Sequence, residues 1–394
     1  MAHLQFVNAL VRRFVAVRAA DELAAQMTNV AVGWYVYGLT HDPMSLAFVG
    51  LAHFVPNLAL VLFAGHAADR VDRRRLVLAS LVGQSLCLGG FGAWAALGRT
   101  QVAPLYLMLA VLGAARALGA PALSALLPGL VGEAQLPRAV AASTLAFQLC
   151  TLAGPALGGL VYAVLGTGVF VAAGALYLAA ALLVWPLRVG RPPPAEATRD
   201  EDLFAGLRYV RRNRRLLGLL SLDLVAVLLG GAAALVPIYA RDVLAVGPIG
   251  LGCLRGAPGV GAALVGLVLA RRPIERHAGR RMLVCVAGFG AATLVFALSR
   301  WLWLSLAALV VAGGFDMVSM VIRQTLVQLS TPDAMRGRVS AVSWAFIGAS
   351  SELGEFESGV TAALFGTVPA AALGGLGTLA AVALWSRLFP ELRE

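Results

Sequence analysis

Apolar runs of about 20 residues recur along all 394 residues of the chain, and each is long enough to cross a bilayer as an α-helix. Within lipid, backbone polar groups must be paired inside a helix or a closed barrel, and continuous apolar runs favour helices over alternating barrel strands. A composition that is 60% hydrophobic, with a mean hydropathy of +0.83, excludes an ordinary soluble domain. The sequence therefore predicts an all-α membrane protein with about 12 transmembrane helices.

Short polar turns separate these apolar runs and set the expected boundaries. One longer polar segment, 187–215, lies near the middle of the chain, and residues 122–138 are expected to form a short cytoplasmic connection. The sixth span should end near Trp185. The other expected spans are 14–39, 45–68, 76–97, 103–121, 139–162, 216–240, 250–270, 282–299, 302–325, 339–364 and 367–389.

The net charge of +11 follows this topology. All 31 basic residues are arginine, and the expected spans place 24 of them on one surface and three (Arg99, Arg241, Arg300) on the other. Four more, Arg18, Arg116, Arg255 and Arg323, fall inside spans. Because arginine-rich loops stay in the cytoplasm, we expect a multi-pass protein of the bacterial cytoplasmic (inner) membrane with both termini cytoplasmic. No basic stripe interleaved with aromatic residues favours a nucleic-acid partner.

The middle segment divides the chain into two halves that repeat one another. Residues 127–147 align without gaps on residues 326–346, which indicates duplication of a six-helix unit. We expect two pseudo-symmetric six-helix bundles, 1–186 and 216–394, joined by a cytoplasmic linker, 187–215. Within the linker, apolar residues at helical spacing oppose a row of arginines, which predicts an amphipathic helix lying on the inner membrane surface.

Soluble-enzyme chemistry finds little support in the sequence. The four cysteines are isolated within apolar runs, and the five histidines lack metal-ligand spacing. Without lysine the chain has no Walker A loop for a nucleotide and no Schiff base. The first eleven residues lack the pattern of a cleaved signal peptide. We therefore expect no enzyme activity, no metal and no cofactor.

Ionisable and polar residues inside the spans are the candidates for function. Each is costly in the membrane unless it is paired, hydrated or protonated, so such residues mark solute or proton pathways. The alternative is that several pair structurally or lie near helix ends. Asp21 and Glu22 begin a polar stripe on the first span, and Glu352 and Glu355 share a helix face. The candidates for proton coupling or a substrate cavity are Asp21, Glu22, Gln26, Asn29, Arg116, Asp223, Asp316, Arg323, Glu352 and Glu355.

Two short motifs resemble signatures of the major facilitator superfamily. Residues 65–75 follow the pattern G-x-x-x-D-R-x-x-R-R between the second and third spans, although Asp72 stands where the family usually has glycine. The fifth span contains Gly154, Pro155, Gly158 and Gly159, which resemble the antiporter motif of exporters in that superfamily. Without the resemblance, the first motif could serve topology alone and the second close helix packing alone.

The whole chain resembles the drug–proton antiporter branch that includes enterobactin-exporter and macrolide-efflux type proteins, and residues 30–40, 204–215 and 336–339 also look like that branch. The resemblance implies a secondary active transporter that exports a small amphiphilic molecule, drug-like or siderophore-like, by alternating access. It also implies the proton gradient as energy source, with protons, the lipid bilayer and a small-molecule substrate as partners, and a monomer. An importer or facilitator of a small solute, or a transporter-like membrane sensor, stays open.

By the same resemblance, Gly65, Asp69, Arg70, Arg73 and Arg74 form a conformational-switch loop. Asp69 would lie against the start of the eleventh span, expected near Val339, in a charge network completed by Arg336 or Arg338.

Overall fold

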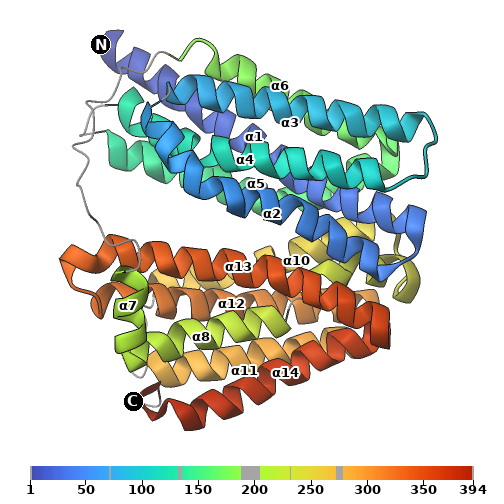
Figure 1. Cartoon of the computed structure of the whole chain (residues 1–394), viewed down its shortest axis with the longest axis vertical. Coiled ribbons are helices and arrows are strands. Elements are labelled where there is room, and N and C mark those ends of the chain that lie inside the picture. Colours follow the sequence, from blue (N-terminus) through green and yellow to red (C-terminus); the bar gives the residue numbers. More distant parts are fainter. Residues whose placement is uncertain are drawn as a thin grey trace. The chain divides into compact units, whose positions relative to one another are not determined.

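The computed structural model describes residues 2–70, 72–131, 135–187, 205–230, 232–271 and 278–392. These residues form helices joined by short turns, with no strand among them (Figure 1). The predicted all-α class is confirmed. In the first half of the chain, the helices are α1 (Ala2–Thr40), α2 (Pro43–Arg70), α3 (Arg73–Ala96), α4 (Ala103–Leu130), α5 (Leu136–Leu165) and α6 (Gly168–Val184).

The second half of the chain begins with a short helix, α7, inside the segment predicted to be the linker. Asn213 caps the next helix, because its side-chain oxygen accepts a hydrogen bond of 3.2 Å from the backbone N–H of Leu216. The helices are α7 (Ala205–Arg212), α8 (Arg214–Leu229), η1 (Ala232–Leu235), α9 (Val236–Ile238), η2 (Tyr239–Val243), α10 (Gly247–Arg271), α11 (Ala278–Leu298), α12 (Leu302–Leu329), α13 (Asp333–Phe365), α14 (Thr367–Leu388) and η3 (Pro390–Leu392).

Nine stretches of the described residues are long and apolar enough to cross a membrane by length and composition. They comprise α2, α3, α4, α5, residues 216–243, α10, α11, α12 and α14. Three further helices complete the expected set of about 12. Of these, α6 has 17 residues, whereas α1 and α13 carry the polar residues that the sequence analysis singled out.

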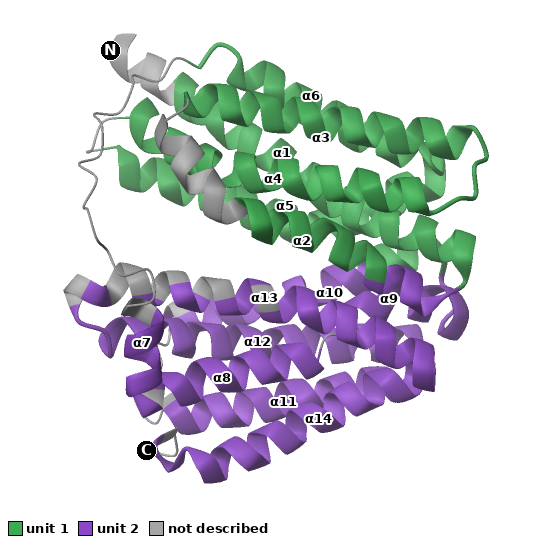
Figure 2. Cartoon of the chain, in the orientation of Figure 1, with its two compact units in different colours: residues 1–41, 48–197, 247–252 green, residues 42–47, 198–246, 253–394 purple. Residues whose placement is uncertain are grey.

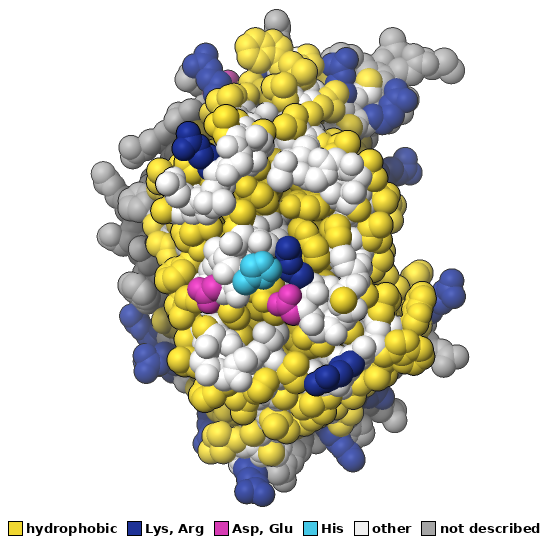
Figure 3. Space-filling model, turned by 90° about the vertical axis from the view of Figure 1, so that its right-hand side faces the viewer, with side chains coloured by type: hydrophobic (Ala, Val, Ile, Leu, Met, Phe, Trp, Pro, Cys, Tyr) yellow, Lys and Arg dark blue, Asp and Glu magenta, His cyan; other side chains and the backbone are white. Residues whose placement is uncertain are grey.

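Large apolar side chains lie on the outside of the helices, as the bilayer requires. Leu86 on α3, Val164 on α5 and Leu182 on α6 each keep about two-thirds or more of their surface exposed. Figure 3 looks onto the ends of the helices, and even there hydrophobic side chains cover most of the visible face and charged ones are few. A surface this apolar is stable against lipid tails rather than water, so the chain is a multi-pass membrane protein.

The chain divides into two compact units (Figure 2). The first comprises residues 1–41, 48–197 and 247–252, and the second comprises residues 42–47, 198–246 and 253–394.

Helices pair in the same pattern within each half of the sequence. In the first half α1 packs against α5 and α6, and α3 packs against α4 and α6. In the second half the helices at the equivalent positions pair identically, because α8 packs against α13 and α14, and α11 packs against α12 and α14. This correspondence agrees with the duplication that the gapless alignment of residues 127–147 on 326–346 predicted.

The core of the first unit is aromatic as well as aliphatic. The rings of Phe91 on α3 and Phe170 on α6 lie 5.2 Å apart, and Tyr35 on α1 meets Phe170 edge-on at 5.7 Å. Both phenylalanines are fully buried. Ring pairs of this kind fix the spacing of α1, α3 and α6 and so hold α1, which carries the polar stripe, in a defined rotation.

Three expected boundaries were wrong. Helix α4 continues to Leu130, where we expected a connection from residue 122, because Leu123, Leu126 and Leu127 recur at helical spacing and are buried. Helix α13 begins at Asp333, directly after its N-cap Pro332, and not near Val339, because the polar segment 333–338 continues the same helix before its apolar part.

The third correction concerns the span expected over 216–240. Helix α8 ends at Leu229 with Gly230 as its C-cap, and a 3₁₀ turn, one short α-turn and a π-turn follow up to Val243. Pro237 contributes to the interruption because it lacks a backbone N–H.

Two glycines on neighbouring helices pack against the last turn of α8. A Cβ atom added at Gly354 on α13 would lie 2.8 Å from the carbonyl oxygen of Val227. One added at Gly374 on α14 would collide with the carbonyl oxygen of Leu229. These helices therefore approach α8 backbone to backbone.

Candidate functional site

A buried carboxylate on α1 binds three polar side chains from three helices. Glu22 is 3% exposed, and its Oε1 accepts hydrogen bonds from Gln26 Nε2 at 2.7 Å and from Thr151 Oγ1 at 3.1 Å. Its Oε2 forms an ion pair with Arg116 Nη2 at 3.4 Å. Gln26 lies one turn further along α1, Thr151 is on α5 and Arg116 is on α4. We call these four residues the Glu22 cluster.

Further charges surround the Glu22 cluster. Asp21 lies within electrostatic range of both Arg18 and Arg116. The guanidinium of Arg18 stacks over the Phe147 ring of α5 at 4.7 Å from the ring centroid. Two carboxylates and two guanidiniums therefore lie together in this part of the first unit, so their charges balance.

The helix 5 motif brings α5 close enough to α1 for these bonds. A Cβ atom added at Gly154 would lie 2.5 Å from Gln26 Cβ, and one added at Gly158 would lie 2.8 Å from Met27 Cα. Gly154, Pro155, Gly158 and Gly159 are all buried. Because no side chain separates the two backbones, Thr151, three residues before Gly154, reaches the carboxylate of Glu22.

A cavity of about 230 Å³ opens beside the same three helices. Its apolar lining includes Phe14 and Phe147, and its polar lining includes Arg18 and three hydroxyl side chains. Such a mixture suits a molecule with an apolar body and a few polar groups. The cavity is lined by Phe14, Arg18, Ser124, Leu127, Val140, Ser143, Thr144 and Phe147.

The second unit contains its own buried ion pair. Asp223 on α8 and Arg323 on α12 bind each other, and their side chains are 8% and 4% exposed. Both residues are candidates from the sequence, which does not indicate that they pair. Removing either partner would leave an uncompensated charge in the membrane interior.

The remaining candidates are distributed over several places. On α13, Glu355 has Arg255 of α10 as its electrostatic partner, and Glu352 lies one turn before it. Asp316 on α12 and Asn29 on α1 have exposed side chains. The structure therefore brings Asp21, Glu22, Gln26 and Arg116 together. Asn29 and Asp316 lie outside the Glu22 cluster and outside the buried Asp223–Arg323 pair.

Sequence reasoning missed two residues of these clusters. Thr151 was absent from the candidates, although its place three residues before Gly154 on the small-residue face was a usable signal. Arg255 was recognised as an arginine within a span but was not assigned to a site. In the structure its charge partner is Glu355 on another helix, so a charged residue inside a span is a reason to look for an opposite charge on a different span.

The predicted switch loop is shorter than expected, because α2 continues through Arg70 and α3 begins at Arg73. The structure does not describe the surroundings of five residues of the predicted network: Gly65, Asp69, Arg70, Arg336 and Arg338. Arg73 donates a hydrogen bond of 3.2 Å to the carbonyl oxygen of Ala125, and Arg74 donates to that of Trp185.

Asp72, at the position where the family pattern has glycine, caps α3. Its Oδ1 accepts a 2.9 Å hydrogen bond from the backbone N–H of Arg74. An aspartate at this position therefore satisfies one of the free N–H groups at the start of the helix. No group of three or more metal-binding side chains occurs within the described ranges.

Comparisons with known proteins agree with this architecture. The sequence model of the Major Facilitator Superfamily matches residues 16–355. Over 399 aligned residues the chain is 26% identical to the enterobactin exporter EntS of Escherichia coli O1:K1, covering 100% of this chain and 93% of that protein. The protein of the same name from Shigella boydii serotype 18 gives the same values.

Solved structures show the same fold at low sequence identity. A bacterial homolog of the human lysosomal transporter Spinster, inward-facing and unoccupied, superposes with a TM-score of 0.74 at 14% identity, over 99% of this chain and 98% of that one. The nucleoside transporter NupG superposes with a TM-score of 0.72 at 13% identity, over 96% and 99% of the two chains.

Proposed function

Since this chain belongs to the Major Facilitator Superfamily and is a membrane transporter of a small-molecule substrate, we propose that it exports its substrate across the bacterial inner membrane in exchange for protons. In this proposal both termini are cytoplasmic, the chain works as a monomer, and two access states alternate. The proton gradient supplies the energy, with no bound cofactor.

The Glu22 cluster is the observation that carries this proposal. An ionised Glu22 holds Arg116 by charge and accepts hydrogen bonds from Gln26 and Thr151. A proton on Glu22 removes the charge that Arg116 pairs with and turns one acceptor oxygen into a donor. Because α1, α4 and α5 each contribute one of these groups, the protonation state of Glu22 changes the energy of their packing. Proton binding can thus favour one access state over the other.

The direction and substrate class follow from similarity and from the cavity. The relatives that match the whole chain export enterobactin, which favours export over import. The cavity beside Arg18 combines aromatic rings with hydroxyl groups and a guanidinium. We therefore propose an amphiphilic substrate, drug-like or siderophore-like, that carries groups able to accept hydrogen bonds from Arg18.

The test uses purified protein in liposomes with an imposed proton gradient. Transport is followed for a panel of siderophores, macrolides and cationic dyes, and proton movement is followed with an internal pH dye. We expect wild type to move one of these classes against its gradient only while the proton gradient lasts. Glu22→Gln should lose transport driven by the proton gradient but should still let the substrate move down its own concentration gradient.

Glu357→Gln is the matched control, because Glu357 lies in a membrane helix but binds only Thr361 of its own helix among the described contacts, at 2.6 Å. It should transport like wild type. Gradient-driven transport at wild-type rate in Glu22→Gln would overturn proton coupling through this cluster. Accumulation of substrate on the cytoplasmic side would identify an importer, and transport without any response to the gradient would identify a facilitator.

A further inference from the structure

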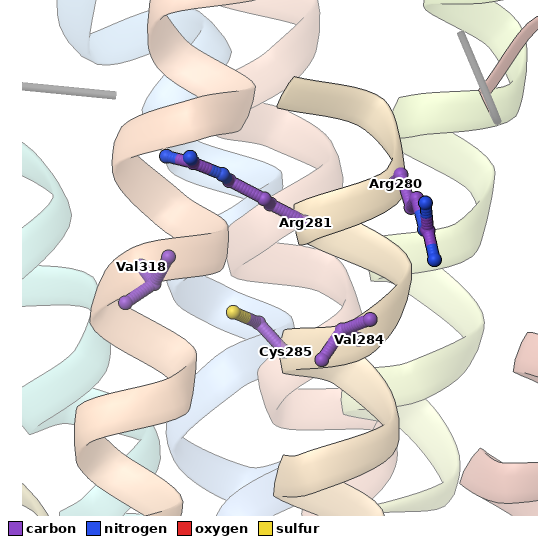
Figure 4. A pocket seen from close by; sticks show the side chains of 5 residues that line it. All are labelled: Arg280, Arg281, Val284, Cys285 and Val318. Carbon is purple, nitrogen blue, oxygen red and sulfur yellow. The ribbon is translucent and has the colours of Figure 1, made fainter. Parts of the chain in front are cut away.

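A groove between α11 and α12 in the second unit lies outside the Glu22 cluster and the buried ion pairs. It has a volume of about 340 Å³ and is lined by Arg280, Arg281, Val284, Cys285 and Val318 (Figure 4). Two arginines stand at one end of the groove, and the other three lining residues are uncharged.

The groove changes from charged to apolar along the helix axis. Arg281 and Cys285 lie one turn apart on the face of α11 that points toward α12, where Val318 faces them (Figure 4). Arg280 and Val284 form a second pair with the same spacing on α11. A turn of helix rises about 5.4 Å, so each guanidinium projects from a point one turn closer to the membrane surface than the apolar floor.

The groove closes about one turn deeper. A Cβ atom added at Gly288 on α11 would lie 2.6 Å from the ring of Phe315 on α12, so the two helices touch there. From Arg281 to Gly288 is seven residues, or about 10 Å along the axis. The groove therefore has room for a charged group and the short apolar segment attached to it, and the rest of a longer molecule would extend out of the groove along the outside of the helices.

Both arginines are exposed, and neither forms an ion pair among the described residues. They lie at the start of a membrane helix on the surface that carries most of the arginines, which is where anionic lipid headgroups lie in the inner leaflet. A guanidinium binds phosphate through paired hydrogen bonds, and neighbouring basic residues between membrane helices bind acidic headgroups.

We propose that this groove binds an anionic glycerophospholipid of the inner leaflet. The phosphate binds the guanidinium of Arg281, which reaches toward α12, and Arg280 adds positive charge on the neighbouring face of α11. The glycerol backbone with the first methylenes lies over Cys285 and Val318. Charge complementarity selects the headgroup, and the apolar floor distinguishes a lipid from a free phosphate ion. The site depends on the inner-surface placement of these arginines and not on which solute the protein carries.

The experiment titrates the purified, detergent-solubilised protein with dioleoylphosphatidylglycerol or dioleoylphosphatidylcholine and counts retained lipids by native mass spectrometry. Wild type should bind the anionic lipid about tenfold more tightly than the zwitterionic one, because Arg281 contacts the headgroup and Arg280 adds positive charge beside it. The double variant Arg280→Gln/Arg281→Gln should lose this preference. Arg271→Gln, which removes an exposed arginine at the end of α10, is the matched control and should keep it.

Val318→Trp fills the apolar floor and keeps both arginines. It should weaken binding of both lipids. This variant tests whether lipid binds in the groove even if the double variant does not fold. Equal lipid preference in wild type and the double variant, or unchanged binding in Val318→Trp, would overturn the proposal. Sodium phosphate at the same concentrations should not compete with the lipid; full competition would assign the groove to free phosphate instead.

Discussion

Arg323 on α12 and Asp223 on α8 form an ion pair that is almost completely buried within the second unit. The two residues are a hundred positions apart in the sequence, yet each supplies the only opposite charge that the described ion pairs give the other. Their attraction compensates for the loss of water around both groups, so the pair is stable only while both charges are present.

Asp223→Asn should therefore destabilise the protein by about 3–5 kcal/mol, because Arg323 is left charged and unpaired. Replacing both residues, as Asp223→Leu with Arg323→Met, should cost much less than either single change or even stabilise the fold. Thermal unfolding of the purified variants measures both effects. Asp316→Asn, an exposed carboxylate on the same helix as Arg323, is the control and should unfold like wild type.

A second prediction concerns the contact of α5 with α1. Gly158→Ala should destabilise the protein by about 1–3 kcal/mol, because the added methyl would lie 2.8 Å from Met27 Cα. Gly89→Ala on α3 is the matched control, since nothing lies within 4 Å of the added carbon. That variant should be neutral or gain up to about 1 kcal/mol through helix propensity. Equal melting temperatures for both variants would contradict a close backbone contact at Gly158.

A third prediction concerns topology. In a cysteine-free background, Arg208→Cys on α7 should react with a membrane-impermeant thiol reagent only after the inner side is made accessible. Arg300→Cys, in the turn between α11 and α12, should react from outside in intact cells. Reaction of Arg208→Cys in intact cells would reverse the proposed orientation, and the expected place of both termini with it.

A fourth prediction tests the hydrogen bond that Thr151 donates to Glu22 without changing how the side chain packs. Thr151→Val removes the hydroxyl that donates to Glu22 while keeping the shape of the side chain. The single proton of this hydroxyl is shared between Glu22 and the carbonyl oxygen of Phe147, 3.0 Å away, so its bond to Glu22 contributes only about 1 kcal/mol. We expect gradient-driven transport to slow about fivefold, with little loss of stability. Thr151→Ser restores the donor and should recover most of the rate. Equal rates for the valine and serine variants would exclude a role for this hydroxyl.

The fold could be predicted from the sequence because a bilayer leaves few alternatives. Continuous apolar runs predicted the all-α class and the approximate spans. Boundaries were less certain where they depended on more than hydropathy. The extension of α4 past Pro121 and the interruption after Leu229 depend on how neighbouring helices pack, and hydropathy does not contain that information.

The candidate site was only partly predictable for a similar reason. A charge inside a span is visible in the sequence, but its partner belongs to another helix. Helical spacing placed Gln26 beside Glu22, whereas Thr151 and Arg116 reach Glu22 only through the packing of α5 and α4 against α1. The pairing of Asp223 with Arg323 likewise depends on how α8 meets α12.

The contacts of α8 with its neighbours also bear on motion. Gly354 and Gly374 present no side chains to the last turn of α8, so the surfaces that meet there are smooth backbone rather than interlocking ridges. Interlocked side chains must change rotamer before one helix can shift along another, and each such change has a barrier. Where a glycine meets backbone, no side chain has to change rotamer before the helices shift. The contacts of Gly354 and Gly374 therefore add no rotamer barrier to small shear displacements of the end of α8 along α13 and α14.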